Sequence, residues 1–184
     1  ACKISHPCRI AVAMDEAFSF YYQDNLDELE MAGAELCYFS PIHDLSLPEA
    51  DGLYLGGGYP ELYLPQLSEN DAMRAGILHA IQDGMPTVAE CGGFLYLQSA
   101  LKDEMGTPWP MVGALPGAGY GTERLQRFGY LTLTGETDSL LLRAGETVPA
   151  HEFHYWDSTD CGTALAAKKA NGRTWRCGFA GKRL

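Results

Sequence analysis

The sequence predicts one α/β domain built on an open, mostly parallel β-sheet with helices on both faces. Short apolar runs alternate with helical patterns over residues 9–101, and this alternation is typical of parallel sheets. Beyond about residue 110 the hydrophobic pattern changes to period two, and Asn171-Gly172 is a strong hairpin signal. We therefore expect antiparallel strands in the second half, which either extend the same sheet or cover its edge.

The first half contains four apolar runs of strand length. They predict strands at residues 9–14, 35–39, 51–55 and 87–89. Tyr22, Leu26 and Leu29 recur at helical spacing after the first run, and Gly33 ends that helix. Before the fourth run, an amphipathic helix carries Met73 and Ile77 on its apolar side.

The second half is expected to be mainly β-structure. Alternating apolar residues predict a strand at 127–134, and two further strands at 164–168 and 174–178 flank the Asn-Gly turn.

Composition limits the classes of function. The 184 residues carry a formal net charge of −11, which argues against binding to nucleic acid or to an anionic membrane surface. No run approaches the roughly 18–20 apolar residues that span a bilayer. Six cysteines without a C-x-x-C pair favour a reduced, cytoplasmic protein.

Two groups of possible metal ligands are weak candidates. Cys2, His6 and Cys8 match no common zinc spacing. His151 and His154 are three residues apart in a β-like context, where such side chains point to opposite faces. We expect no metal in this domain.

The most informative motif is Glu90-Cys91-Gly92-Gly93, which joins the fourth strand to a helical pattern. This layout predicts a nucleophile elbow, with Cys91 at a helix N-terminus where the dipole favours the thiolate. The alternative is a buried structural cysteine, but the flanking Glu and glycines favour a nucleophile. We expect Glu90 to orient the elbow, and Cys37, in a strand pattern, to be buried.

A second glycine run, Gly56-Gly57-Gly58, follows the third strand. Its backbone N–H groups, together with that of Gly92, could stabilise an oxyanion. A tight turn without a ligand is the alternative, whereas a phosphate loop is disfavoured because no Lys lies in the run. A thiolate with oxyanion donors predicts acyl transfer from an amide or ester.

These motifs together resemble those of the class I (triad) glutamine amidotransferases. The segment Gly57–Glu61 is similar to their oxyanion strand and Ala89–Gly93 to their nucleophile elbow. Four further segments resemble the cobyrinic acid a,c-diamide synthases, over nearly all of residues 9–180 but only in the C-terminal half of those enzymes. These segments are Asp15–Phe18, Tyr21–Leu26, Leu125–Tyr130 and His151–Tyr155.

The resemblance implies a flavodoxin-like fold and a glutaminase domain over residues 1–184, with Cys91 as nucleophile and Gly57, Gly58 and Gly92 as oxyanion or substrate-binding residues. It implies ammonia taken from glutamine for ATP-dependent amidation of the a and c carboxylates of cobyrinic acid, a corrin, in cobalamin biosynthesis. The domain itself would hold no cofactor. We expect a fragment that lacks the N-terminal synthetase domain, where ATP and Mg²⁺ would bind, and the last C-terminal strand. None of the five histidines matches the family's catalytic one.

Several alternatives stay open on the sequence alone. The same architecture serves cobyric acid synthase and the a,c-diamide synthase of a nickel tetrapyrrole. A non-catalytic amidotransferase-like binding module and a cysteine hydrolase or deglycase with a similar sheet are further possibilities.

Overall fold

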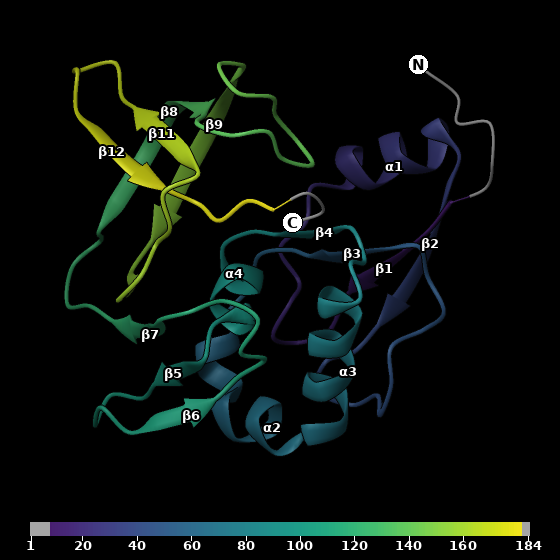
Figure 1. The fold of residues 1–184 in the computed structure, drawn as a ribbon. Helices are drawn as coiled ribbons and strands as arrows, with labels where there is room; N and C mark the ends of the chain where they lie inside the picture. The colour runs from purple at the N-terminus through teal and green to yellow at the C-terminus, as the bar shows by residue number, and fades with distance from the viewer. Residues whose placement is uncertain (1–7, 182–184) are drawn as a thin grey trace.

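The computed structural model describes residues 8–181 (Figure 1). Its first half forms a four-stranded parallel sheet with the order β2-β1-β3-β4. The strands are β1 (Cys8–Ala13), β2 (Ala34–Phe39), β3 (Gly52–Leu55) and β4 (Thr87–Ala89). The predicted open parallel sheet is therefore confirmed, and the carboxyl ends of β3 and β4 lie side by side.

Helices cover both faces of this sheet, as the alternating pattern predicts. Figure 1 places α1 (Gln23–Ala32) and α3 (Asp71–Gln82) on opposite sides. Gly33 ends α1 with φ of 108°, and the Asn70 side chain caps α3 by accepting a hydrogen bond from the Met73 amide. A short 3₁₀ turn, η1 (Pro60–Tyr63), and α2 (Leu64–Glu69) connect β3 to α3. Within residues 8–181, no helix has the length and apolarity needed to cross a bilayer.

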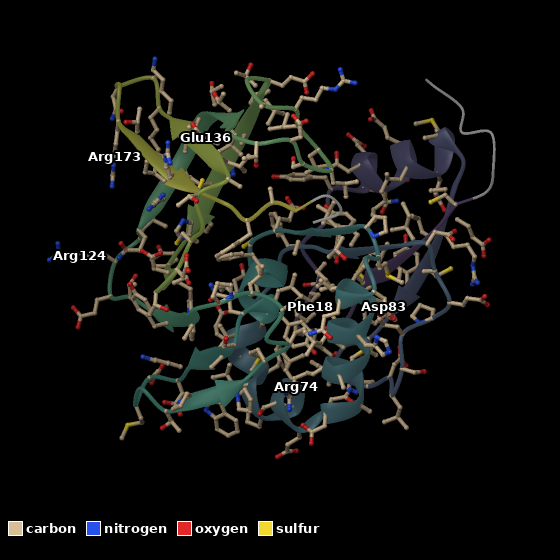
Figure 2. All side chains as sticks on the ribbon, in the orientation of Figure 1. Phe18, Arg74, Asp83, Arg124, Glu136 and Arg173 are labelled. Carbon is tan, nitrogen blue, oxygen red and sulfur yellow. The ribbon has the colours of Figure 1, made fainter. Side chains whose placement is uncertain are left out.

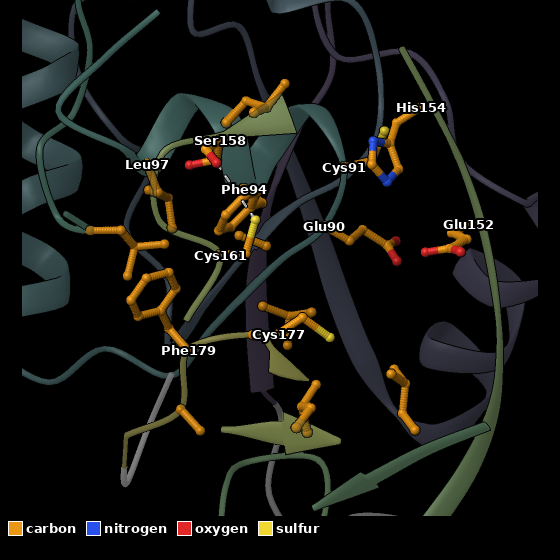
Figure 3. A pocket seen from close by; sticks show the side chains of 18 of the residues that line it. Glu90, Cys91, Phe94, Leu97, Glu152, His154, Ser158, Cys161, Cys177 and Phe179 are labelled. Atoms are coloured by element: carbon orange, nitrogen blue, oxygen red, sulfur yellow. Dashed lines mark hydrogen bonds between the residues drawn. The ribbon is translucent and has the colours of Figure 1, made fainter. Parts of the chain in front are cut away.

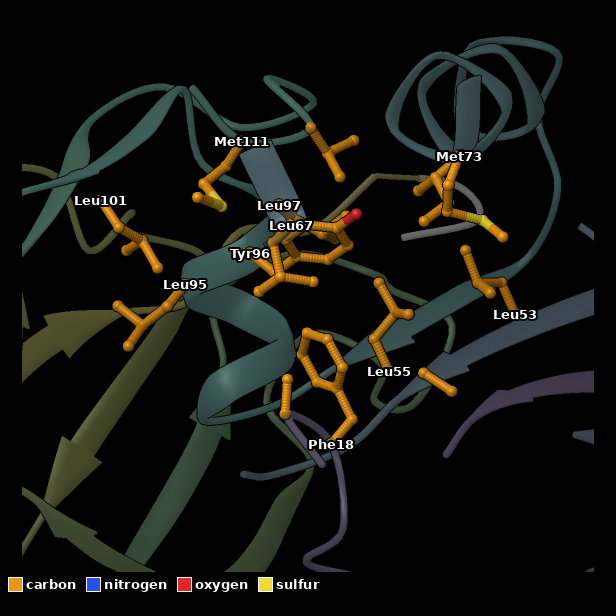
Figure 4. Packing of buried hydrophobic residues seen from close by; sticks show 14 of the residues in the cluster. Phe18, Leu53, Leu55, Leu67, Met73, Leu95, Tyr96, Leu97, Leu101 and Met111 are labelled. Carbon is orange, nitrogen blue, oxygen red and sulfur yellow. The ribbon is translucent and has the colours of Figure 1, made fainter. Parts of the chain in front are cut away.

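The hydrophobic core lies between β3, α3 and the helix α4 (Gly92–Leu97) that follows the elbow (Figure 4). Leu55 of β3 and Ile77 of α3 are fully buried in it. Phe18 packs against Tyr96 of α4 with 5.3 Å between ring centroids. The core therefore fixes α4, and with it the elbow, against the end of β3.

The antiparallel strands expected in the second half are confirmed, but they do not extend the parallel sheet, which was one of the two arrangements considered. The second half forms two further four-stranded sheets, ordered β10-β7-β5-β6 and β12-β11-β8-β9. The strands are β5 (Ala100–Lys102), β6 (Pro108–Pro110), β7 (Ala118–Gly121), β8 (Arg127–Gly135), β9 (Thr147–His154), β10 (Trp156–Ser158), β11 (Leu165–Lys168) and β12 (Thr174–Cys177). Three of their six ladders join hairpin neighbours, and among the described residues no strand pairs with the outer edge of β4.

The long hairpin of β8 and β9 presents two different faces. His151 packs edge-on against Phe128 and Tyr130 on the exposed face. Glu152 and His154 lie on the other face, with Glu152 largely covered. The prediction that His151 and His154 point apart is thus confirmed, because side chains alternate along a strand.

We predict that Gly93→Ala lowers the free energy of unfolding by about 1–3 kcal/mol, the usual cost of overpacking. A Cβ at this position would lie 2.1 Å from the Leu55 carbonyl oxygen, which is backbone and cannot rotate away. Gly76→Ala in α3 is the matched control, because a Cβ there meets nothing within 4 Å. It should stabilise the protein by up to about 1 kcal/mol. Equal effects of the two substitutions in chemical denaturation would contradict the close packing of α4 on β3.

Candidate active site

Cys91 sits in a sharp turn between β4 and α4. Its backbone has φ of 52° and ψ of −113°, and it is the one non-glycine residue with positive φ among residues 8–181. Such a conformation costs on the order of 1–3 kcal/mol and persists only where the surroundings enforce it. The observed turn has the strand–turn–helix geometry that the sequence predicts at this position.

Close contacts with the glycine turn after β3 hold the elbow in place. The Gly93 amide donates to the Gly56 carbonyl over 2.9 Å and to the Glu90 carbonyl over 3.0 Å. A Cβ on Gly92 would lie 3.0 Å from the Gly58 nitrogen. The two glycine motifs, more than 30 positions apart in the sequence, therefore form one backbone unit.

Two of the three glycines that the sequence predicts as oxyanion donors lie close to the Cys91 thiol. The backbone N–H groups of Gly58 and Gly92 both hydrogen bond to the Cys91 thiol and lower its pKa. Gly57 contributes differently, since its carbonyl accepts from the Phe20 amide over 3.1 Å. The structure thus brings Gly58 and Gly92 to Cys91, while Gly57 anchors the turn.

The net effect of the surroundings is to raise the pKa of the Cys91 thiol. Desolvation by the nearby walls is the largest cause, even though the residue as a whole is exposed, and the negative charges of Glu61 and Glu90 add to it. The Gly58 and Gly92 amides oppose these effects only in part. The amide at the helix N-terminus thus favours the thiolate, as expected, but desolvation and the two carboxylates outweigh it and the net pKa of Cys91 is raised.

Glu90 orients the elbow, as expected. The Tyr54 hydroxyl donates to the Glu90 carboxylate over 2.5 Å. Beside it, the Tyr21 hydroxyl accepts from the Gly56 amide over 2.9 Å and donates to the Ala13 carbonyl. This network links the residue before the nucleophile and the glycine turn to the core of the sheet.

A cavity of about 660 Å³ opens beside Cys91. Figure 3 shows Glu90 and Cys91 on one wall, with Glu152 and His154 of β9 across from Glu90. The His154 Nδ1 is 2.6 Å from the Trp156 carbonyl oxygen, so it is the donor in that bond and Nε2 is left free. Within the described part of the chain, no histidine hydrogen bonds to the Cys91 thiol.

The other cysteines differ from Cys91 in exposure. Cys37 is half-buried and accepts a hydrogen bond from the Arg9 guanidinium over 3.3 Å, so the expectation that it is buried is wrong. Burial raises the pKa of Cys161 and of Cys177. Cys91 is the one exposed cysteine of residues 8–181.

The two groups of possible metal ligands gain no support from the described part of the chain. Cys2 and His6 lie outside the described residues. Residues 8–181 bring together no group of three His, Cys, Asp or Glu side chains that could hold a metal ion.

Sequence reasoning missed three residues that shape the site. Glu61 lies inside the motif Gly57–Glu61, so its position could have been inferred from that resemblance. Arg127 likewise lies inside the segment Leu125–Tyr130, which the resemblance includes. Tyr54 gave no signal, because the partner of its hydroxyl depends on tertiary contacts.

We predict that the alkylation rate of Cys91 by iodoacetamide rises continuously from pH 7 through the alkaline range. A raised pKa leaves little thiolate at neutral pH, and only the thiolate reacts. Glu61→Gln removes a repelling charge and should lower the pKa, so that alkylation at pH 7 becomes faster. Glu69→Gln, on the exposed side of α2, is the matched control and should change nothing. A plateau reached below pH 7 in the wild-type protein would refute this reading.

Comparisons with known proteins agree with this geometry. Residues 9–181 match the model of the CobB/CobQ-like glutamine amidotransferase domain. A cobyrinate a,c-diamide synthase of Dehalococcoides mccartyi is 49% identical over 148 residues, covering 80% of this chain and 32% of that protein. One of Listeria innocua is 43% identical over 176 residues, covering 93% and 39%. The chain thus spans a third to two fifths of the length of these relatives.

A solved structure shares the fold at low sequence identity. The structure of PurLQS from Thermotoga maritima superposes with a TM-score of 0.61 at 18% identity, covering 88% of this chain and 75% of that one. The elbow, the two amides at the thiol and the match over residues 9–181 lead to one conclusion: the chain belongs to the family of CobB/CobQ-like glutamine amidotransferase domains.

Proposed function

We propose that this chain is the glutaminase of a larger ATP-dependent synthase. The observation that carries the proposal is the convergence of the Gly58 and Gly92 amides on the Cys91 thiol, at the mouth of a cavity large enough for an amino acid. Such an arrangement stabilises the oxyanion of an acyl-transfer reaction and suits the side-chain amide of glutamine.

The reaction proceeds in two steps. The Cys91 thiol gives up its proton, its sulfur bonds to the side-chain carbonyl carbon of glutamine, and the oxyanion accepts hydrogen bonds from Gly58 and Gly92. The carbon–nitrogen bond then breaks, and ammonia leaves with a proton. Water hydrolyses the thioester, so that glutamate is released and the thiol is restored.

The general base is proposed to be a histidine outside residues 1–184. Two features support this placement. His154 lines the cavity without bonding to the thiol, and His151 lies on the opposite, exposed face of the hairpin. In addition, the outer edge of β4, directly before Cys91, is unpaired among the described residues and lies along the cavity. A further strand could pair there and bring a side chain to Cys91.

The ammonia is proposed to amidate the a and c carboxylates of cobyrinic acid, in cobalamin biosynthesis. Support comes from the names of the relatives at 49% and 43% identity and from the family match. ATP, Mg²⁺ and the corrin would bind to a synthetase region that corresponds to the remaining length of those relatives. A cytoplasmic location is proposed as well, in keeping with the unpaired cysteines of the described residues.

Glutamine hydrolysis tests the catalytic groups. In a chain that carries its general base, Cys91→Ala should abolish hydrolysis. Gly58→Val should reduce it about a hundredfold, the usual effect of losing one oxyanion donor, because a side chain at Gly58 would meet the Ala17 carbonyl oxygen at 2.0 Å. Gly76→Ala is the control. Unchanged hydrolysis by Gly58→Val in a folded protein would remove this turn from the mechanism.

The placement of the base has a separate test. Residues 1–184 alone should hydrolyse glutamine very slowly, since within residues 8–181 no histidine bonds to the thiol to accept its proton and pass it to the departing amine. Extending the chain by its natural C-terminal continuation should restore turnover, and a single histidine of that continuation should be essential. Equal rates for the two chains would show that the base lies within these residues, with His154→Gln the first variant to examine.

A further inference from the structure

The outer face of the β8–β9 hairpin carries a continuous row of aromatic side chains. Neighbouring rings lie 5.5–6.1 Å apart between their centroids and meet edge to face. The members of this aromatic face are Phe128, Tyr130, His151, Phe153 and Tyr155. Its Phe and Tyr rings are 50–85% exposed. The rings therefore contact one another but stay largely open to solvent.

The aromatic face joins two segments that the proposed reaction does not use. Leu125–Tyr130 and His151–Tyr155 are distant in the sequence, and the ladder between β8 and β9 sets them side by side. Because side chains alternate along a strand, Glu152 and His154 of the second segment point the other way, toward the Cys91 cavity (Figure 3). The hairpin is therefore a wall with the cavity on one side and the aromatic face on the other.

A row of exposed rings does little for the stability of the isolated domain. A Phe or Tyr side chain buries about 150–250 Å² when it is covered, so the aromatic face offers several hundred Å² of largely apolar surface. Contiguous apolar patches of that size mark interaction sites in soluble proteins. The aromatic face is therefore suited to a partner.

Charged side chains surround the aromatic face and leave its centre free of charge. Lys168 of β11 is exposed and pairs in the ladder with Thr132, which follows Tyr130 on the same face of β8. Arg124, shortly before β8, is exposed and projects away from the domain (Figure 2). An aromatic centre with few charges and a polar rim is the composition of a protein–protein interface. The composition therefore favours a protein as the partner.

The relatives of this chain indicate which protein covers the face. The match spans 32% of one cobyrinate a,c-diamide synthase and 39% of another, so most of each relative lies outside it. Interfaces between domains of one chain bury about 600–1,500 Å², and the aromatic face can supply the centre of such an interface. Ammonia that escapes into water is protonated and lost as a nucleophile. A glutaminase therefore has to be held against the site that consumes its product.

We propose that the aromatic face docks on the synthetase region of the complete enzyme and fixes the glutaminase next to the site where ammonia is used. This assignment rests on the proposed function and adds to it the surface that couples the two reactions. A region docked there lies directly behind the cavity wall, with the hairpin between it and the cavity.

Hydroxyl-radical footprinting with mass spectrometry compares the rings in the complete enzyme and in residues 1–184 alone. Oxidation of Tyr130 should slow at least about fivefold in the complete enzyme, because a ring that is 85% exposed in this chain would lie in the covered centre of an interface. Phe153 should be protected as well. Tyr38 is the matched control, since it is 51% exposed on β2 at the edge of the parallel sheet, and it should react equally in both proteins.

Turnover of the complete enzyme separates docking from structural damage. Tyr130→Ser, alone and combined with Phe153→Ser, removes rings that lie outside the hydrophobic core of this domain. With glutamine as the nitrogen source, the ratio of glutamate released to amide formed should rise severalfold, because ammonia escapes before it is used. With added ammonia, amidation should proceed as in the wild type. Tyr38→Ser should leave both measurements unchanged.

The outcomes distinguish this proposal from the glutaminase function. Equal oxidation of Tyr130 in both proteins, or unchanged coupling in the double variant, overturns the docking and leaves the glutaminase function standing. Protection that is already present in residues 1–184 and disappears on dilution assigns the aromatic face to a second copy of this chain, which also overturns the proposal. A complete enzyme without Cys91-dependent hydrolysis of glutamine overturns the glutaminase function and, with it, the role of docking in ammonia transfer.

Discussion

The positive backbone φ of Cys91 is maintained by a direct link between two strand ends. The Gly93 amide donates to the Gly56 carbonyl, and no side chain separates α4 from the turn after β3. The turn is fixed in its own right by the segment before α1, since Phe20 donates to Gly57 and Tyr59 donates to Ala17. A substitution that adds volume at this contact would therefore move Cys91 and the Gly58 and Gly92 amides, the proposed nucleophile and oxyanion donors, together.

The electrostatics of the site favour an uncharged thiol until a substrate arrives. Desolvation and the charges of Glu61 and Glu90 raise the pKa of Cys91, and only backbone donors oppose them. A protonated thiol is a weak nucleophile and resists oxidation. The same backbone donors become more valuable once negative charge forms on a substrate oxygen, because they are already in place and need no rearrangement. The site therefore stabilises negative charge on a substrate oxygen better than it stabilises a thiolate before the substrate binds.

The sequence predicted the local features of this protein but not the contacts between residues that are far apart in the chain. The elbow could be predicted because Glu90-Cys91-Gly92-Gly93 combines a strand end, a tight turn and a helix start within a few residues. In the second half, alternation and the Asn-Gly turn predicted the strands β8, β11 and β12, whereas the strands β5, β6, β7, β9 and β10 were missed. The pairing of these strands was not predicted, because it depends on which sheet edges are free in the folded chain. Cys37 shows the same limit, because a strand pattern does not reveal whether other elements cover that face of the strand. The stacking of Arg127 on Trp175 likewise follows from tertiary contacts alone.

A crystal structure of the chain with Cys91 alkylated by the diazo-ketone analogue would examine the whole arrangement at once. The account predicts a covalent bond to the Cys91 sulfur and a ketone oxygen that accepts hydrogen bonds from the Gly58 and Gly92 amides. An adduct on Cys161 or Cys177, or a ketone oxygen turned toward solvent and away from both amides, would contradict it.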